Sequence, residues 1–195
     1  PLPDDCFLVA EDAVSLRQRM KSDQGYQRAY CKNAFFTGTD IATKLWVGDY
    51  QNGDSFQDLA QESAGIRRLA VLRADIDNLG QAFVSGFESE KYGQRYVTLS
   101  RTATFSRKLA LFFKRHVNTL LENGNTFLVD GDDPARKATI VYSGGDDMFV
   151  IGAWDDILGF AVDLYDTLSR YSQGMLTISA GIGIYPEKYP IAAMA

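Results

Sequence analysis

Acidic residues in two apolar segments give the strongest indication of chemistry in this sequence. The segment Arg68–Asp77 reads RLAVLRADID, and its last two acids are Asp75 and Asp77. Residues two apart in a strand point to the same face, so these two carboxylates leave one face together. The segment Thr139–Gly152 reads TIVYSGGDDMFVIG, in which two glycines precede two aspartates. It predicts a hairpin with its tip at Gly144–Asp147, where glycine permits a positive φ and the close approach of a ligand.

If the two segments are neighbouring strands, three or four carboxylates meet at one end of a sheet. Such groups repel each other unless a cation lies between them. Mg²⁺ takes oxygen ligands, uses one or two carboxylates and completes its shell with water and substrate phosphates. Two ions about 3.5–4 Å apart can clamp an in-line phosphoryl displacement, one at the attacking 3′-hydroxyl and one at the leaving pyrophosphate. The sequence therefore predicts a site for two Mg²⁺ or Mn²⁺ ions, although Gly-Asp strings also occur in ordinary hairpin turns.

The elements around these acids follow an α+β pattern. Strand, helix, hairpin, helix and strand succeed one another, which predicts a ferredoxin-like antiparallel sheet with helices on one face. Helical spacing of apolar residues marks the long helices, and runs of consecutive apolar residues mark buried strands. The expected elements are a strand at Arg68–Asp77, a short helix or turn at Asn78–Phe87, a helix at Tyr96–Glu122, room for a short strand at Thr126–Val129, a hairpin at Ala138–Gly152, a helix at Trp154–Tyr171 and a strand at Met175–Tyr185.

The predicted domain organisation separates residues 1–64 from residues 65–195. The first part is expected to be a small mixed α/β segment of a preceding linker domain, and the second is the sheet domain. Turn residues and capping residues bound the elements expected in the first part, which are strands at Cys6–Ala10 and Lys44–Tyr50 and helices at Glu11–Met20 and Asp54–Ser63. The chain begins without Met and ends partway into an apparent helix, so we expect it to be a piece of a longer protein.

The composition disfavours several classes of protein. With 46% apolar and 23% charged residues, the chain is typical of globular proteins and not of disordered ones. A net charge of −5 argues against general polyanion binding, but Arg95–Arg115 holds six Lys and Arg residues and no acid, which allows a local basic face or a solvated helix surface. Cys6, Cys31 and His116 supply a zinc site poorly, and the two cysteines are typical of reduced thiols in a cytoplasmic protein. No apolar stretch approaches the ~18 residues of a membrane span.

Four segments together resemble one known family. LRADIDNLG, SRKLALFF, VYSGGDDMFVIGAW and LTISAGIGIYPEKYPI occur in an order that resembles the large subunit of type III CRISPR effector complexes, and the sequence around SGGDD is similar to the Csm (type III-A) branch. The resemblance covers about residues 66–195, and ATKLWVGDY extends it upstream. It implies an adenylyl-cyclase-like palm domain, C-terminally truncated here. This domain would make cyclic oligoadenylates from ATP, by 3′–5′ phosphodiester formation, when the complex holds target RNA.

The resemblance also implies roles for individual residues. The implied metal ligands are Asp75, Asp77, Asp146 and Asp147, of which Asp146 and Asp147 are the catalytic pair. The residues implied to line the nucleotide site are Ser143, Gly144, Gly145 and, through its carbonyl, Ile76. ATP is the implied substrate, and the implied partners are other Csm subunits, crRNA and target RNA, with no membrane.

Two other functions stay open. A diguanylate cyclase would use GTP, but Leu79 and Gly80 replace the Phe and Lys of its DxDxFK pattern, and Phe83 stands where its guanine-binding Asn would be. A non-catalytic palm would instead support RNA and partner subunits, and the Arg95–Arg115 stretch suits phosphate contacts. The HD nuclease motif of the large subunit has no counterpart, because His116 has no adjacent Asp, so these residues are expected to show no DNase activity.

Overall fold

The chain divides into two compact units, Pro1–Val47 and Gly48–Ala195. The computed structural model describes residues 9–22, 28–36, 41–128, 133–190 and 193. The boundary between the units lies upstream of the predicted one at 64/65, because residues 50–52 already pair with the sheet of the second unit. The Asn52 N–H, for example, donates to the Ala138 carbonyl at 2.9 Å. From Gly48 onward, the segment expected to belong to a preceding domain is therefore part of the sheet unit.

The described residues of the first unit form one helix and a two-stranded parallel sheet. Its elements are α1 (Ala13–Ser22), β1 (Tyr30–Lys32) and β2 (Thr43–Leu45), and its buried residues are Met20, Cys31, Phe36 and Ala42. Helix α1 begins two residues later than predicted, because Asp12 caps it by accepting from the Val14 and Ser15 N–H groups at 2.8 and 3.0 Å. Strand β2 is shorter than the predicted Lys44–Tyr50. The predicted strand Cys6–Ala10 lies mostly outside the described residues.

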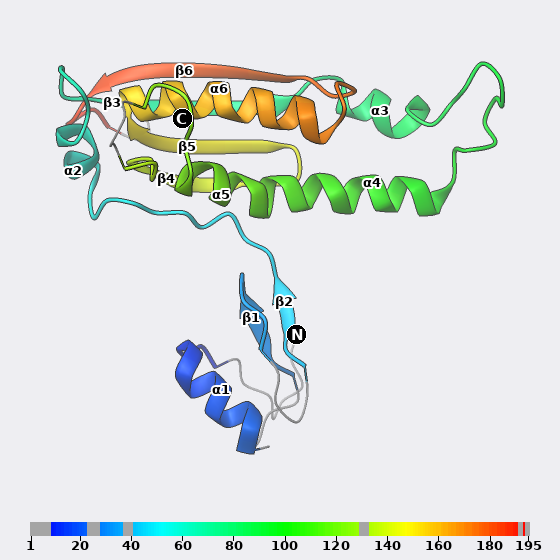
Figure 1. Cartoon of the computed structure of the whole chain (residues 1–195), viewed down its shortest axis with the longest axis horizontal. Coiled ribbons are helices and arrows are strands. Elements are labelled where there is room, and N and C mark those ends of the chain that lie inside the picture. The colour runs from blue at the N-terminus through cyan, green and yellow to red at the C-terminus, as the bar shows by residue number, and fades with distance from the viewer. Residues whose placement is uncertain (1–8, 23–27, 37–40, 129–132, 191–192, 194–195) are drawn as a thin grey trace. The chain divides into compact units, whose positions relative to one another are not determined.

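The second unit is built on a four-stranded antiparallel sheet. Its elements are α2 (Phe56–Gln61), β3 (Arg68–Ile76), α3 (Leu79–Ser85), α4 (Leu99–Leu111), the π-helical turn η1 (Phe112–His116), α5 (Val117–Glu122), β4 (Ala138–Ser143), β5 (Asp147–Ala153), α6 (Trp154–Tyr171) and β6 (Ile178–Pro186). The strand order is β4-β5-β3-β6. Helices α4, α5 and α6 run along one face of the sheet (Figure 1), which confirms the predicted α+β fold. The short α2 packs on the opposite face, unlike the prediction.

Alternation along β3 divides its side chains between the two faces of the sheet. The even-numbered residues from 70 to 76 are buried against α4, α5 and α6. The odd-numbered residues begin with Leu69 and Val71, which pack in one cluster with Leu59 of α2. Arg73 and Asp75 continue this second row and are exposed. We call this part of the sheet surface, opposite α4–α6 and carrying Arg73 and Asp75, the open face.

The predicted helix Tyr96–Glu122 contains a π-turn. It begins at Leu99, because the side chain of Thr98 caps α4. At η1 the Val117 N–H donates to the Phe112 carbonyl, five residues back rather than four. Single π-turns inside α-helices are rare and frequently mark functional sites. None of the described helices combines the length and the apolar character that crossing a membrane requires.

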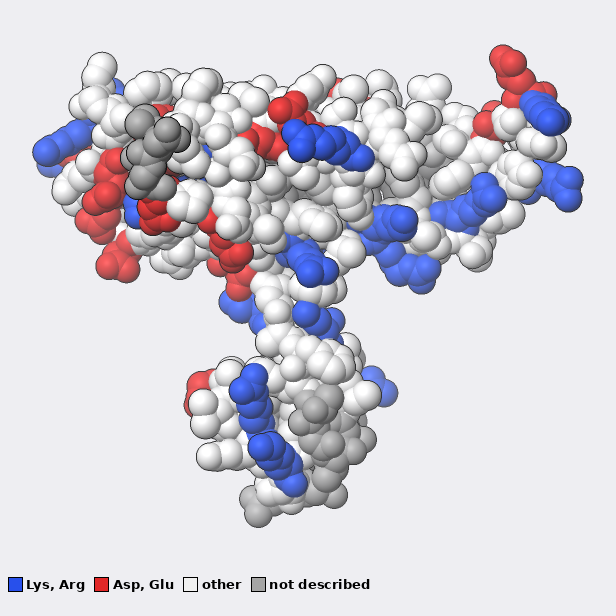
Figure 2. Space-filling model, viewed as in Figure 1, with Lys and Arg blue, Asp and Glu red and all other residues white. Residues whose placement is uncertain are grey.

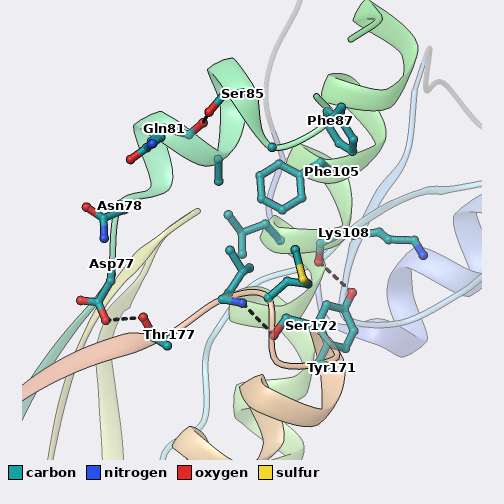
Figure 3. Close-up of a pocket in the computed structure, with 15 residues that line it drawn as sticks. Asp77, Asn78, Gln81, Ser85, Phe87, Phe105, Lys108, Tyr171, Ser172 and Thr177 are labelled. Atoms are coloured by element: carbon teal, nitrogen blue, oxygen red, sulfur yellow. Dashed lines mark hydrogen bonds between the residues drawn. The ribbon is translucent and has the colours of Figure 1, made fainter. Parts of the chain in front are cut away.

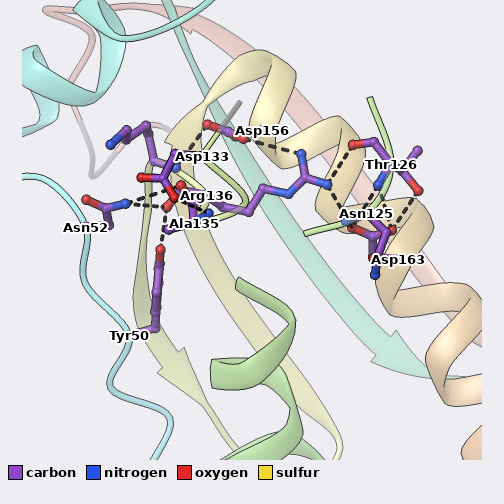
Figure 4. Close-up of polar contacts among 10 residues, drawn as sticks. Tyr50, Asn52, Asn125, Thr126, Asp133, Ala135, Arg136, Asp156 and Asp163 are labelled. Atoms are coloured by element: carbon purple, nitrogen blue, oxygen red, sulfur yellow. Dashed lines mark hydrogen bonds and ion pairs between the residues drawn. The ribbon is translucent and has the colours of Figure 1, made fainter. Parts of the chain in front are cut away.

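A buried arginine fixes the connection between α5 and β4 (Figure 4). Arg136 is 1% exposed, and its Nη2 donates to Asp163 Oδ2 of α6 at 2.8 Å and to the Thr126 carbonyl at 2.7 Å. Its Nη1 donates to Asp156 Oδ1 at 3.3 Å. Burial opposes the charged form of Asp163, but hydrogen bonds outweigh it and hold the pKa of Asp163 below its ordinary value. Burial raises the pKa of Asp156.

The loop that Arg136 ties down takes the place of a predicted strand. The Asp163 carboxylate accepts from the Asn125 and Thr126 N–H groups at 3.0 and 3.1 Å, so these donors are engaged by a side chain. Phe127 has a φ of 60°, in the left-handed region, which a strand does not allow. The short strand predicted at residues 126–129 is therefore wrong over its described part, 126–128.

Candidate active site

Asp75 and Asp147 lie opposite each other on β3 and β5. They are register partners in the antiparallel pair. The Ile76 N–H donates to the Asp146 carbonyl at 3.2 Å, so the hydrogen bond falls at the next pair along the strands. Asp75 and Asp147 thus occupy a non-hydrogen-bonded position, where facing Cβ atoms are closest, about 4.5–5.5 Å apart. Two carboxylates from segments 72 residues apart (147 − 75) therefore share the open face.

The hairpin that carries Asp147 is closed by its own backbone. The Gly144 N–H donates to the Asp147 carbonyl at 2.8 Å. Neither Gly144 nor Gly145 has a positive φ, so the positive φ that glycine permits is not used at this tip. Gly144 is needed for space, because a Cβ on it would lie 2.7 Å from Asp147 Oδ1. A Cβ on Gly145 would meet nothing within 4 Å, so Gly145 leaves the tip open to a ligand.

Tyr142 also lies at this site, although no sequence pattern indicated it. The register of β4 against β5 shifts between Ile140 and Tyr142, and this bulge pairs Tyr142 with Phe149. The two rings stack with centroids 6.1 Å apart and planes at 14°. The Tyr142 hydroxyl donates to Asp147 Oδ2 at 3.0 Å. One side of the Asp147 carboxylate is therefore held by Tyr142, and the other lies against Gly144.

Asp77 is turned toward β6. Its carboxylate accepts from the hydroxyls of Ser179 at 2.5 Å and of Thr177 at 2.6 Å. These two hydrogen bonds, first that of Ser179 and then that of Thr177, lower the pKa of Asp77. Asp75 is paired with Asp147 on one side and with Ser179 on the other, and it therefore lies between Asp147 and the Asp77 group. Asp146 precedes β5 and is exposed at the hairpin tip.

The acids fit a divalent cation that arrives with a phosphate. Within the described ranges, no three Asp, Glu, His or Cys side chains are grouped so as to hold an ion by themselves. Mg²⁺ needs one or two carboxylates when water and phosphate oxygens complete its shell. Asp75 and Asp147 meet that need, and in the part of the chain that the structure describes no Lys or Arg forms an ion pair with either of them. Their mutual repulsion is thus left for a cation to relieve.

Ser143 and Ile76 contribute to this region mainly through the backbone. The Ser143 hydroxyl donates to the Phe113 carbonyl at 2.6 Å and so faces the helix layer. The Ile76 side chain is 3% exposed and packs in the helix-side core. Of the predicted nucleotide-site residues, Gly144 and Gly145 present backbone to the open tip.

A cavity of about 470 Å³ begins beside Asp77, between α3, α4 and the connection from α6 to β6. Figure 3 shows Phe87 and Phe105 in its wall, and their rings meet edge to face at 6.1 Å. This cavity was not predicted from the sequence, because aromatic residues such as Phe87 and Phe105 are equally typical of a hydrophobic core. The other lining residues include Asn78, Gln81, Ala82, Ser85, Lys108, Tyr171 and Met175.

Comparisons with known proteins point to one family. The family model described as "Cas10/Cmr2, second palm domain" matches residues 68–195. A relative from Mycobacterium tuberculosis, named CRISPR system single-strand-specific deoxyribonuclease Cas10/Csm1 (subtype III-A), is 52% identical over 197 residues and covers 100% of this chain. The match takes up 24% of that relative, so the chain spans about a quarter of its length.

Solved structures also match most of this chain, and the match again covers about a quarter of the other chain. The crystal structure of Csm1 in T. onnurineus aligns with a TM-score of 0.73 and 29% identity, over 87% of this chain and 25% of that one. Crystal structures of a Csm1–Csm4 cassette in complex with one ATP and in complex with cA4 align with TM-scores of 0.69 and 0.68. The identities are 31% in both cases, over 82% of this chain and 23% of the other.

Proposed function

Because the chain belongs to the Cas10/Cmr2 family and contains its second palm domain, we propose that it holds the acids with which a type III-A effector subunit joins ATP into cyclic oligoadenylates. The observation that carries this proposal is the pairing of Asp75 with Asp147 on the open face, next to the exposed Gly145 tip. The Csm1–Csm4 cassettes described as complexes with ATP and with cA4 support the same substrate and class of product.

The reaction joins the 3′-oxygen of one nucleotide to the α-phosphorus of another and releases pyrophosphate. Two Mg²⁺ or Mn²⁺ ions, when bound, would activate the 3′-hydroxyl and neutralise the triphosphate. Asp75 and Asp147 would hold them from the sheet, with Asp146 at the hairpin tip and Asp77 as a further acid. Positioning and electrostatic stabilisation of this kind account for most of the catalysis in phosphoryl transfer.

The cavity beside Asp77 would receive the base of one ATP. Its volume of about 470 Å³ lies within the usual range for ligand pockets, and its wall combines aromatic rings with a few polar groups. Asp77 borders both the cavity and the open face, so a base in the cavity would bring its triphosphate toward Asp75 and Asp147. Phe87 and Phe105 offer aromatic rings to the base, and Asn78 and Gln81 offer amide groups.

The same proposal includes the partners of the protein and its location in the cell. Relatives solved as Csm1–Csm4 assemblies make other Csm subunits the expected partners, with crRNA and target RNA reached through the complex. The complex would act in the cytoplasm, where ATP and transcripts are found. The relatives are named deoxyribonucleases, but we assign no DNase chemistry to the described part of the protein. His116 is half-buried beside Phe112 and Tyr171, with ring centroids 6.0 and 5.3 Å away.

A non-catalytic RNA scaffold is the second candidate, and the surface of α4 favours it. Figure 2 shows Lys and Arg side chains gathered over α4. Arg101, Arg107 and Lys108 are exposed, and no acid of the described residues forms an ion pair with them. Such cations bind RNA phosphates with an affinity that falls as salt rises. A scaffold, however, has no use for two facing carboxylates that repel each other.

Product analysis separates these functions. The assembled complex with target RNA is incubated with ATP and Mg²⁺ or Mn²⁺, and the products are identified by mass. We expect cyclic oligoadenylates from the native complex and none from a complex in which Asp146→Ala and Asp147→Ala are combined, with crRNA and target RNA still bound. Equal product from both complexes would favour the scaffold. Faster turnover of GTP than of ATP would favour a diguanylate cyclase.

A further inference from the structure

Ser143 connects the GGDD hairpin to the helix layer. It is the last residue of β4, directly before Gly144, and it is half-buried. Its hydroxyl donates to the Phe113 backbone carbonyl at 2.6 Å, across 30 residues of sequence. A hydroxyl at a strand end next to an open tip would ordinarily be bound to water. Here it is bound to a backbone group of another element.

The acceptor is held rigidly by the π-turn. Phe113 lies within η1, where the hydrogen-bond register of the helix slips by one residue. Its side chain is fully buried, and its ring meets that of Phe112 edge to face at 5.5 Å. A backbone carbonyl fixed in this way cannot rotate toward another donor as a side-chain acceptor can. The π-turn therefore presents a stationary anchor to the hairpin.

Gly48 covers this hydrogen bond from the other side. A Cβ on Gly48 would lie 2.7 Å from the Ser143 Cβ and 3.5 Å from the Phe113 carbonyl oxygen. The residues after Gly48 are fixed to α5, since Asn118 Oδ1 accepts from the Asp49 N–H at 3.1 Å. Gly48 thus packs against a hydrogen bond that is part-buried, a setting in which such a bond is stronger than in water.

The hydrogen bond between Ser143 and Phe113 affects the position of Asp147. Gly144 donates its N–H to the Asp147 carbonyl, and its Cα leaves room for the Asp147 carboxylate. A displacement of Ser143 would therefore move Asp147 relative to Asp75. We propose that Ser143 is a positioning residue, which fixes the GGDD hairpin against the π-turn so that Asp147 stays opposite Asp75. Its role in catalysis rests on the proposed function, whereas its role in fixing the hairpin does not.

The test compares Ser143→Ala with Thr102→Ala in the full-length subunit within its assembled complex. Thr102 donates its hydroxyl to the Thr98 carbonyl at 3.2 Å inside α4, so this control loses a similar bond away from the hairpin. Hydrogen exchange of the peptide covering residues 139–147 and the rate of ATP turnover are both measured. For Ser143→Ala we expect exchange about three- to tenfold faster, as for the loss of one hydrogen bond. We also expect a kcat about tenfold lower, with the KM for ATP within about twofold.

Gly48→Ala gives an independent second variant and should reproduce both effects, because its Cβ displaces Ser143. Unchanged exchange in Ser143→Ala would overturn the proposal, and so would faster exchange with an unchanged kcat, which would restrict Ser143 to folding. If the combined Asp146→Ala and Asp147→Ala variant still made product, the proposed function would fail. The exchange measurement alone would then decide whether Ser143 fixes the hairpin.

Discussion

Asp75 of β3 and Asp147 of β5 are direct partners across the sheet, on the face opposite α4–α6. Antiparallel neighbours at such a non-hydrogen-bonded position bring their side chains closer than the hydrogen-bonded pairs next to them do. Two like charges there destabilise the sheet unless something compensates them. The pairing is thus costly for folding alone, and the cation that we propose for this site would offset that cost.

Gly144 and Gly145 should differ when each is changed to Ala. The new Cβ of Gly144→Ala would lie 2.7 Å from Asp147 Oδ1 and push the carboxylate away. We expect the Mg²⁺ concentration for half-maximal synthesis to rise about tenfold, a usual result when a metal ligand is misplaced. Gly145→Ala meets no protein atom, so its metal dependence should be native and any effect confined to the KM for ATP. Equal metal dependence in the two variants would refute the role given to Gly144.

A larger side chain on α3 would narrow the cavity beside Asp77. Ala82 lines the cavity, whereas Val84 on the same helix is 73% exposed and does not. Ala82→Leu should raise the KM for ATP about tenfold with little change in kcat, because lost ground-state binding appears in KM. Val84→Leu, the matched control, should behave as the native chain does. If both variants kept the native KM, the base would have to bind elsewhere.

The Arg136 network predicts a large effect on stability. Asp163→Ala removes the partner of a guanidinium that is 1% exposed and should lower the free energy of unfolding by about 3–5 kcal/mol. Asp166→Ala changes an exposed acid of the same helix and should shift it by less than about 0.5 kcal/mol. Urea unfolding followed by circular dichroism measures both. Similar midpoints for the two variants would show that the buried pair contributes little.

His116 predicts a pH dependence of stability. Burial, and next the nearby charge of Arg115, lower the pKa of His116 in the folded state below the 6.5 of an unperturbed histidine. The unfolded chain therefore binds a proton more readily, and this contribution to stability, complete above about pH 6.5, is lost as the pH falls toward the folded pKa.

His116→Phe keeps an aromatic ring next to Phe112 and Tyr171 and removes the titration. The melting temperature of the variant, measured from pH 8 to pH 5, should fall less steeply than that of the native chain. Parallel curves for the two proteins would show that His116 does not contribute to the acid sensitivity.

Local patterns predicted the elements of the sheet unit well. Helix α6 spans the predicted residues Trp154–Tyr171, since its apolar stripe and the acids of its first turn agree. Strand β3 ends one residue before the predicted end at Asp77, and the apolar run that predicted it is buried on both faces over residues 69–72. Both predictions depend only on the order of residues within the segment concerned.

Features that depend on distant contacts could not be predicted in this way. The register that sets Asp75 opposite Asp147 is one, because a slip of one residue would move a whole strand to the other face. The bulge that brings Tyr142 beside Asp147 is another, and it has no local signature in TIVYS. The engagement of the Ser143 hydroxyl by a π-turn 30 residues upstream is a third.

The central claim is that Asp75 and Asp147 act together to hold Mg²⁺ at the triphosphate. It is tested most directly by calorimetric titration of ATP into the assembled subunit, with Mg²⁺ and with EDTA, for the native chain, Asp75→Asn, Asp147→Asn and the double variant. We predict that Mg²⁺ tightens ATP binding in the native chain, that either single change removes most of this gain, and that the double variant is within about twofold of each single one. Retention of the full Mg²⁺ effect in Asp75→Asn, or losses that multiply in the double variant, would contradict the claim.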